Sequence, residues 1–388
     1  MVGHDLDSCN RNGPWNQFLN LILNDSDKTI KIKEFYEQYE HIAPALFFFG
    51  GFLLDVFTLG RVDDGLNIVT LTFYLVISLY TFVLEIKEVK LTETSSKLKT
   101  LILTYRDEIF HFGQGALLSA FTLFYFKSAS LSTSLIFLLF MVSLLLLNEL
   151  PAFQKLGHLI KGILINLSLL SFCLVYIPQI GGKVGTLMFI LSLSIYALLL
   201  ALFLWAFLKI KCPLPSLKRS WLIPGVGLAF FIFVMRLLNL MPPVPLSLET
   251  AGVYHKVVKD YPRYELHHER PWWRFWHTSD ELFSARPGDK VFFFARIFAP
   301  GGFEDQVFVH WQTYKSGDWL TSDKIPLSIL GGREKGFRGY AYKQNYTPGL
   351  WRVLVETTSG LEIGRLEFEI LSSNETKERN FTVITDGD

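Results

Sequence analysis

The residues best placed to do chemistry in this chain are polar side chains that interrupt long apolar runs in its first 241 residues. Inside a bilayer such a side chain costs several kcal/mol unless it is paired or hydrated, so each one marks a candidate site. They fall into two groups by expected depth. The group near the outer surface contains Asp55, Arg61, Asp63 and Arg236. The group near the inner surface contains Glu108, His111, Gln114, Glu149 and Lys161.

Two interpretations of these groups stay open. Each combines opposite charges at similar depth, which is typical of structural ion pairs and of side chains that reach the membrane interface. The same residues could instead line a polar cavity for a solute, a lipid head group or a proton. Glu108 and His111 are spaced to share a helix face, and such a pair can ligate iron or manganese in helical bundles. No second Glu-x-x-His occurs in the apolar half, so we expect no metal and no cofactor.

A second candidate surface lies after residue 241, where the polarity becomes ordinary. Its candidate binding residues are Trp272, Trp273, Phe275, Trp276, His310 and Trp311. The aromatic run at 272–276 could fill a seam inside the domain, anchor it at the bilayer interface, or form a platform for a sugar or another ligand. This half contains no Gly-x-Ser-x-Gly motif and no cysteine, which favours binding over catalysis.

The elements that must position these residues begin with membrane spans. Half of the 388 residues are hydrophobic and the mean hydropathy is +0.30. A run of about 20 apolar residues crosses a bilayer as a helix. Several runs contain no charge, which a helix in a soluble core would not show. We therefore expect an α-helical bundle of seven spans, at Ile42–Leu59, Leu66–Leu84, Glu108–Phe126, Leu131–Glu149, Leu156–Ile177, Gly185–Leu208 and Ser220–Met241.

Loop charges predict the orientation of the bundle. Fifteen Lys and Arg residues lie on the side of the N-terminus and only three, Arg61, Lys127 and Lys183, on the other. Because positive loops stay in the cytoplasm, the N-terminus is expected there, in a bacterial inner (plasma) membrane. Seven spans would then place everything after Met241 outside, in the periplasm of a Gram-negative cell. No basic cluster is interleaved with aromatic residues, so we expect no nucleic-acid partner.

The chain is expected to contain five parts. Residues 1–40 form a cytoplasmic amphipathic arm, either on the membrane surface or packed as a collar, and 41–241 form the transmembrane domain. Residues 242–286 are a Pro- and aromatic-rich connector without regular structure. Residues 287–371 alternate in strand fashion and predict an all-β antiparallel sandwich, with Trp351, Val353 and Val355 facing its core. Residues 372–388 are polar and predict a disordered tail.

Two stretches of the membrane half resemble a bacterial integral-membrane family: Phe49 through Asp63, and Tyr125 through Ser130. The C-terminal part resembles the domain of unknown function 2914. The matching residues there are Val309-His310-Trp311, Phe337-Arg338, Gly349 through Val353, and Gly360 through Phe368. The resemblance covers most of the chain from about residue 40 to 371. It implies two coupled modules and no particular activity, and it adds no catalytic residue.

Two functions of different classes follow. The first is a non-enzymatic membrane protein that presents a periplasmic β-sandwich to an envelope ligand or partner protein, as a sensor or scaffold. The alternative is a transporter or membrane enzyme that handles a lipid or polar solute through the two polar layers. The two can be told apart by the bundle interior. A polar cavity that joins Asp55 or Arg236 to Glu108 and His111 favours the alternative, whereas isolated polar pairs favour the first.

Overall fold

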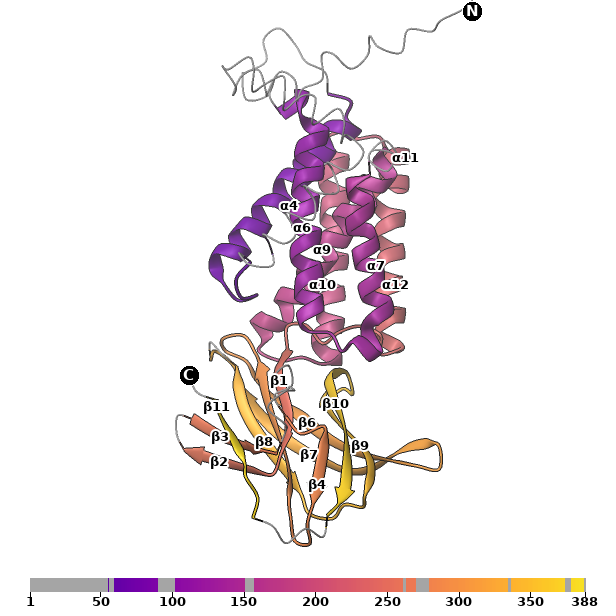
Figure 1. Cartoon of the computed structure of the whole chain (residues 1–388). Coiled ribbons are helices and arrows are strands. Elements are labelled where there is room, and N and C mark those ends of the chain that lie inside the picture. The colour runs from indigo at the N-terminus through magenta and orange to yellow at the C-terminus, as the bar shows by residue number, and fades with distance from the viewer. Residues whose placement is uncertain are drawn as a thin grey trace, which may run out of the picture. The chain divides into compact units, whose positions relative to one another are not determined.

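The computed structural model describes residues 55, 59–89, 102–150, 157–260, 263–269, 279–333, 336–373 and 378–386, without the Glu149 side chain. The chain divides into two units, Met1–Thr58 and Leu59–Asp388. The expected N-terminal arm and nearly all of the expected first span lie outside the described residues. The second unit contains a helical region followed by a β-rich region, coloured indigo to pink and orange to yellow in Figure 1.

Among the described residues, six helical segments are long and apolar enough to cross a membrane. They are α4 (Gly65–Ile86), α6 (Arg106–Lys127), α7 (Leu131–Glu149), α9 (His158–Gly181), α10 (Thr186–Lys209) and the continuous segment α11 (Leu214–Leu217), η1 (Lys218–Leu222) and α12 (Ile223–Leu237). These six correspond to the expected second to seventh spans. The expected count of seven is not confirmed, because the first span falls on residues that the structure leaves undescribed.

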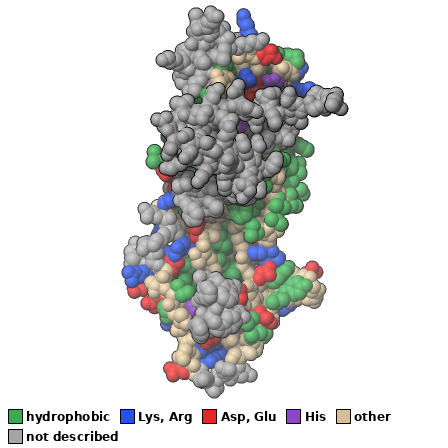
Figure 2. Space-filling view, turned by 45° about the horizontal axis from the view of Figure 1, so that its top comes forward, with side chains coloured by type: hydrophobic (Ala, Val, Ile, Leu, Met, Phe, Trp, Pro, Cys, Tyr) green, Lys and Arg blue, Asp and Glu red, His purple; other side chains and the backbone are tan. Residues whose placement is uncertain are grey.

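Small residues let the helices of the bundle approach closely. At Gly162 on α9, an added Cβ would lie 1.5 Å from the backbone oxygen of Ser220 on η1. At Gly225 on α12, it would lie 2.6 Å from a methyl group of Leu200 on α10. Such contacts are typical of packed membrane helices, where small residues replace the hydrophobic effect as the source of close association. Hydrophobic side chains gather over the helical region in Figure 2, as expected of a lipid-facing surface.

The β-rich region contains three sheets. The first has the order β1 (Ser247–Tyr254), β5 (Val291–Phe298), β8 (Phe337–Lys343). The second has the order β4 (Leu282–Ala285), β10 (Glu362–Ser372), β9 (Gly349–Thr357), β6 (Glu304–Lys315), β7 (Asp318–Leu330). The third has the order β11 (Thr382–Asp386), β3 (Arg263–His268), β2 (Lys256–Asp260). The pairing is antiparallel except between β4 and β10, so the expected all-antiparallel arrangement is wrong at this edge.

One hydrophobic core lies between the first two sheets. Phe293 and Ile297 of β5 belong to the same buried cluster as Trp311 of β6 and Phe368 of β10. Trp351, Val353 and Val355 of β9 are buried in this cluster too, as their alternation in the sequence predicted. The period-two signal was reliable here because β9 has one face in the core and the other outside it.

The segment 242–286, expected to be irregular, contains four strands among its described residues. β1 pairs with β5 along its whole length, and β2 pairs with β3. The prediction failed because these strands show no clean alternation. In β1, the consecutive residues Gly252, Val253 and Tyr254 are all buried, so both faces of the strand are covered there. Strands that are covered on two faces lose the period-two pattern on which the prediction depended.

The polar segment 372–388, expected to be disordered, contains β11, which pairs with β3. Ion pairs, rather than apolar contacts, attach β11 to the rest of the β-rich region. Asp386 forms an ion pair with Arg296 and approaches Arg338 at 3.6 Å. Arg379 forms ion pairs with Glu269 at 3.0 Å and with Asp289 at 2.8 Å. Composition alone indicated disorder because the partners of these charges lie about 50 to 110 residues earlier in the chain.

Asp386→Asn should therefore destabilise the β-rich region. The Arg338 side chain is only 3% exposed, and removal of one partner of a buried ion pair leaves an uncompensated charge. We expect a loss of about 3 kcal/mol of unfolding free energy, measured by denaturant unfolding of the purified protein. Asp318→Asn, in the exposed β6–β7 turn, is the control and should change stability by less than about 0.5 kcal/mol. Equal stabilities of the two variants would show that β11 is not held by this pair.

Candidate functional site

Three helix-connecting loops contact the β-rich region, and we call these contacts the joint. In the loop before α4, Arg61 donates hydrogen bonds to Asp63 at 3.0 and 2.8 Å. Asp63 in turn accepts a hydrogen bond from the backbone N–H of Gly301, at 3.0 Å. The Arg61 guanidinium also lies 5.0 Å from the ring centroid of Phe298 on β5. Two of the predicted site residues thus meet at the joint, where they join a helix terminus to the β-rich region.

The second contact of the joint is the loop between α9 and α10. The Gly182 carbonyl accepts a hydrogen bond from Glu304 N–H at 3.0 Å, and Val184 N–H donates to Asp305 at 2.8 Å. The Val184 side chain is part of the buried β cluster. Gly182 has a φ of +67°, and an added Cβ would lie 2.7 Å from the Gly302 oxygen. Only glycine fits this conformation and this approach, so the loop is closely fitted to the first residues of β6.

The third contact is centred on Glu362, at the start of β10. Its carboxylate accepts hydrogen bonds from Ser130, the N-cap residue of α7, and from Ser132 at 3.1 Å. Arg365 donates two further bonds, at 2.8 and 2.6 Å. Burial raises the pKa of Glu362, but the hydrogen bonds from Arg365 and Ser130 outweigh burial and hold it below its ordinary value. A carboxylate at the N-terminus of α7 also interacts favourably with the helix dipole.

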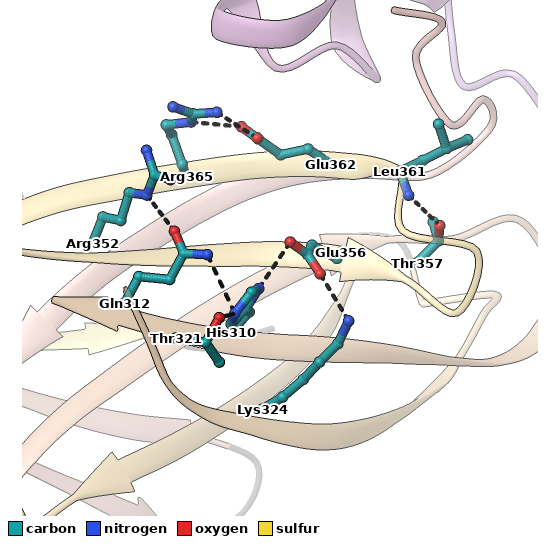
Figure 3. Close-up of polar contacts among 10 residues, drawn as sticks. All are labelled: His310, Gln312, Thr321, Lys324, Arg352, Glu356, Thr357, Leu361, Glu362 and Arg365. Carbon is teal, nitrogen blue, oxygen red and sulfur yellow. Dashed lines mark hydrogen bonds and ion pairs between the residues drawn. The ribbon is translucent and has the colours of Figure 1, made fainter. Parts of the chain in front are cut away.

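A network of polar side chains covers the outer face of the five-stranded sheet, beside the joint (Figure 3). We call it the polar strip; its members are His310, Gln312, Thr321, Lys324, Arg352 and Glu356. Glu356 lies 3.0 Å from His310 Nδ1 through one oxygen and 3.0 Å from Lys324 Nζ through the other. Thr321 Oγ1 lies 2.8 Å from His310 Nε2. Gln312 connects His310, at 3.3 Å, to Arg352, at 2.5 Å.

The partners of His310 assign its protons. A carboxylate only accepts, so Nδ1 donates to Glu356. Gln312 accepts from Arg352 through its oxygen, so its amide N–H faces His310 Nε2. The Nε2 atom of a neutral ring then accepts from Gln312 and from the Thr321 hydroxyl. In a neutral ring, this set of partners therefore places the proton on Nδ1.

Hydroxyl, imidazole and carboxylate follow one another here in the order used by nucleophilic hydrolases. Two features of the described strands oppose catalysis. The Nε2 atom of His310, which would have to take the hydroxyl proton, also contacts the side-chain amide of Gln312. The surrounding residues of β6 are paired on both sides, with β7 and β9, so their backbone groups serve the sheet and not a developing oxyanion. The arrangement suits recognition by rigid side chains better than covalent chemistry.

Aromatic side chains continue the polar strip at its end away from the joint. The Arg352 guanidinium lies 4.3 Å from the ring centroid of Trp319, and Tyr314 packs against Trp319 at 5.2 Å. Tyr314 is 43% exposed and Leu350, its neighbour across the β6–β9 pair, is 48% exposed. Burial and the nearby Arg365 lower the pKa of Arg352.

Residues 304–370, from β6 to most of β10, match a family model described as a protein of unknown function (DUF2914). This part of the chain is a DUF2914 domain. The match includes the whole polar strip and Glu362, and it confirms the C-terminal part of the resemblance. The resemblance of the helical region to a bacterial membrane family is not confirmed by it.

No curated protein matches the sequence. Among solved structures, a β-glucosidase from Listeria innocua in complex with glucose is 14% identical, over 24% of this chain and 15% of that chain, with a TM-score of 0.18. The alkylpurine DNA glycosylase AlkC of Pseudomonas fluorescens, bound to DNA containing an abasic site analog, is 12% identical over 80% of this chain and 99% of that chain, with a TM-score of 0.20. Similarity this low carries no argument about fold or function.

Within the DUF2914 domain, His310 and Trp311, the two adjacent candidates for an external binding surface, lie on opposite faces of β6. His310 lies in the polar strip, but Trp311 is fully buried in the core, and the prediction that it contributes to a binding surface is wrong. Consecutive residues of a strand point to opposite faces, so only one of the two could be external. The run Trp272, Trp273, Phe275 and Trp276 lies outside the described residues, and its three interpretations stay predictions.

The inner polar group of the helical region is centred on Lys161. Its buried ammonium group forms ion pairs with Glu85, on α4, and with Asp107, on α6, the latter at 2.8 Å. His158 lies 3.1 Å from Glu85. The sequence had singled out Lys161 but neither carboxylate. Glu85 ends an apolar run, the place where an interfacial side chain is also expected, so nothing in the sequence distinguished it.

The other inner residues form separate pairs. His111 binds Asn148 on α7 at 2.9 Å, and Gln114 accepts a hydrogen bond from Ser168 on α9 at 2.8 Å. Glu108 is exposed, so the expected Glu108–His111 pair does not form a joint site. Among the described residues, no group of three or more His, Cys, Asp or Glu side chains could hold a metal ion. The Glu149 side chain lies outside the description.

The outer polar residues also separate. Arg236 on α12 lies 3.2 Å from Asn239 and 3.5 Å from Thr186 at the start of α10. Arg61 and Asp63 belong to the joint, as described above. Asp55 lies in the other unit of the chain and has an interaction partner there or elsewhere in the protein.

A cluster at the base of the third sheet was missed by sequence reasoning. His255 is buried, stacks on Phe283 at 4.0 Å and lies 3.3 Å from Glu269. Burial, and then the charge of Arg379, lower the pKa of His255 to about 3, so the ring is neutral. The residues come from four separate segments, and only the fold brings them together.

Lys161→Met tests whether the inner polar group is structural. The substitution leaves two carboxylates facing each other without their shared cation, so we expect a loss of about 3 kcal/mol of stability, measured by unfolding in mixed detergent micelles. Glu85→Gln should cost less in the Lys161→Met background than in the wild type, because the repulsion is then already relieved. Lys218→Met, at an exposed position at the start of η1, should have little effect. Unchanged stability of Lys161→Met would argue against an ion pair that supports the bundle.

Glu362→Gln tests the joint. The lowered pKa of Glu362 means that its stabilising effect is present above its ordinary value of 4.5 and is lost as the pH falls below it. We therefore expect the thermal unfolding midpoint of the wild type to fall in acid more steeply than that of Glu362→Gln. Glu367→Gln, on the same strand but exposed, should retain the wild-type pH profile. Parallel profiles for wild type and Glu362→Gln would show that this carboxylate does not hold the joint.

Proposed function

We propose that this protein is a bacterial inner-membrane protein that presents a β-sandwich in the periplasm, where the domain binds an envelope ligand or a partner protein. The joint is the observation that carries the proposal. Hydrogen bonds and a shared core residue, Val184, fix the DUF2914 domain to the ends of the helices. A domain attached so closely stays at a constant distance from the membrane. As a sensor it would pass its ligand-bound state to the helices, and as a scaffold it would simply be held by them.

The loop charges support the compartment. All three loops of the joint lie on the side that the distribution of Lys and Arg assigns to the outside. They are the α4 end at Arg61–Asp63, the α7 end at Ser130–Ser132 and the α9–α10 loop at Gly182–Val184. The strands that follow α12 leave from the same side, because the chain crosses twice between the α9–α10 loop and β1, through α10 and through α11–η1–α12. Loop charges and contacts thus both support a joint and a β-sandwich on the same, outer side of the membrane.

The alternative, a transporter or membrane enzyme for a lipid or polar solute, remains a second candidate because of one observation. Gln114 Nε2 and Thr122 Oγ1, both on α6, are buried and have no hydrogen-bond partner among the described residues. Unpaired polar atoms in an apolar interior are costly, and a transported polar species would satisfy them. The separate pairing of His111, Gln114 and Arg236 favours the first proposal.

Cysteine labelling in intact cells tests the orientation. In a variant without the three native cysteines, we would introduce Ser316→Cys in the β6–β7 turn or Lys218→Cys at the start of η1, both exposed. An impermeant maleimide that can pass the outer membrane should label Ser316→Cys in intact cells and Lys218→Cys only after lysis. Labelling of Lys218→Cys alone in intact cells would place the DUF2914 domain in the cytosol and overturn the proposal.

A further inference from the structure

We propose that the polar strip, together with Tyr314 and Trp319, is a binding site for a saccharide chain. The inference rests on the proposed function, because it names the class of ligand that the β-sandwich takes from the envelope. Each step below depends on the contacts of the described residues of β6, β7 and β9.

The first argument is preorganisation. Arg352 is held by a hydrogen bond to Gln312 and by its stacking on Trp319, and Gln312 is held in turn by His310. Glu356 fixes the other side of the imidazole ring. Side chains that already hold one another lose little rotamer freedom when a ligand binds, which lowers the entropic cost of binding. Such rigidity matters for ligands that offer only hydrogen bonds in competition with water.

The second argument is the match of hydrogen-bonding groups. Within the described structure, the Arg352 Nη atoms make no hydrogen bond, and Thr321 Oγ1, on the strand at the other side of β6, keeps acceptor capacity. A sugar carries neighbouring hydroxyl groups that both donate and accept. Arg352 and Lys324 together carry two positive charges and Glu356 one negative charge, so the strip has no strong charge that would demand a polyanion. A row of planar donors and acceptors with nearly balanced charge fits a polyhydroxyl chain.

The third argument is the apolar surface at the outer end of the strip. Tyr314 and Leu350 are both exposed at the same end of the β6–β9 pair, and Tyr314 packs against Trp319, its partner on β7. Aromatic rings with one polar end are suited to ligands that present both C–H and O–H groups. Tyr314 lies four residues beyond His310 on β6, which is about 13 Å along a strand. The site is thus long enough for a short oligosaccharide and not only for a single sugar.

A peptide is the main competing ligand, and the geometry favours it less. A peptide that adds to a sheet needs free backbone groups at an edge. Of the three strands under the strip, only β7 is an edge strand, whereas β6 and β9, which carry His310, Gln312, Arg352 and Glu356, are paired on both sides. A helical or folded partner would need a central apolar pocket, and the middle of the strip is polar. Peptide binding is therefore kept as an outcome of the test.

The test uses the full-length protein in lipid nanodiscs, with isothermal titration calorimetry. The probes are chitotetraose, maltotetraose and the core oligosaccharide released from lipopolysaccharide. We expect at least one of them to bind with a Kd below about 1 mM, and Tyr314→Ala and Arg352→Lys each to weaken that binding at least about tenfold. Arg352→Lys keeps the charge but removes the planar fork and its stacking.

Matched controls come from other surfaces of the same domain. Tyr342→Ala removes a similarly exposed tyrosine, 48% exposed, from β8 in the opposite sheet. Arg333→Lys changes an exposed arginine that lies over Phe337, at 5.7 Å. Both should bind within about twofold of wild type, and all variants should keep the wild-type unfolding midpoint. Equal weakening by the controls, or no binding of any probe at about 5 mM, would overturn the saccharide site.

Failure of this inference is distinguishable from failure of the proposed function. A photo-crosslinking amino acid placed at Lys324, at the exposed border of the strip, would capture whatever binds this face in living cells. Capture of a protein or peptide, with no saccharide binding in vitro, would overturn the saccharide inference and leave the proposed function standing. Absence of both capture and saccharide binding would count against both.

Discussion

The hydrogen bond between Val184 N–H and Asp305, with the burial of the Val184 side chain in the β core, is the constraint on which the rest of the structure depends. A loop between two helices here supplies a core residue to a β domain, so neither region completes its packing alone. Glu362 makes a polar contact of the same kind, because its carboxylate, on a strand, accepts a hydrogen bond from Ser130 at the N-terminus of α7. The β domain is consequently packed onto the ends of the helices through short, ordered contacts.

The bundle itself is organised by the cost of polar atoms in an apolar medium. Lys161 satisfies two carboxylates from two other helices, and Asn166 accepts from Tyr196 on α10 while donating to the backbone of α9. Each such contact ties helices that apolar side chains would leave free to slide, because lipid competes equally well for apolar surface. Gly162 and Gly225 act in the same direction by allowing close approach. A bundle held in this way is suited to keeping the joint in a constant geometry.

The sequence predicted what depends on local pattern. The six described spans follow from runs of apolar residues, and β5 to β10 follow from alternation and from turns such as Ser316-Gly317-Asp318. What it could not predict depends on pairing between distant segments. β11 is polar and needs Arg296 and Arg338 to be recognised as a strand, and β1 is hidden by burial on two faces. The candidate site shows the same division: His310 was predicted, whereas Glu356 and Arg352 became partners only through the register of β6 and β9.

The register also explains why the polar strip is informative about function. The core face of β6 and β9 is apolar, so folding requires nothing of the outer face beyond solubility. Scattered Lys and Glu side chains would satisfy that requirement at lower entropic cost than a chain of side chains that hold one another from Trp319 to Lys324. A network that fixes the tautomer of His310 and the plane of Arg352 restricts the surface to one arrangement of donors and acceptors. Such restriction gains little stability at an exposed surface, but it lowers the cost of recognising a ligand whose groups match it.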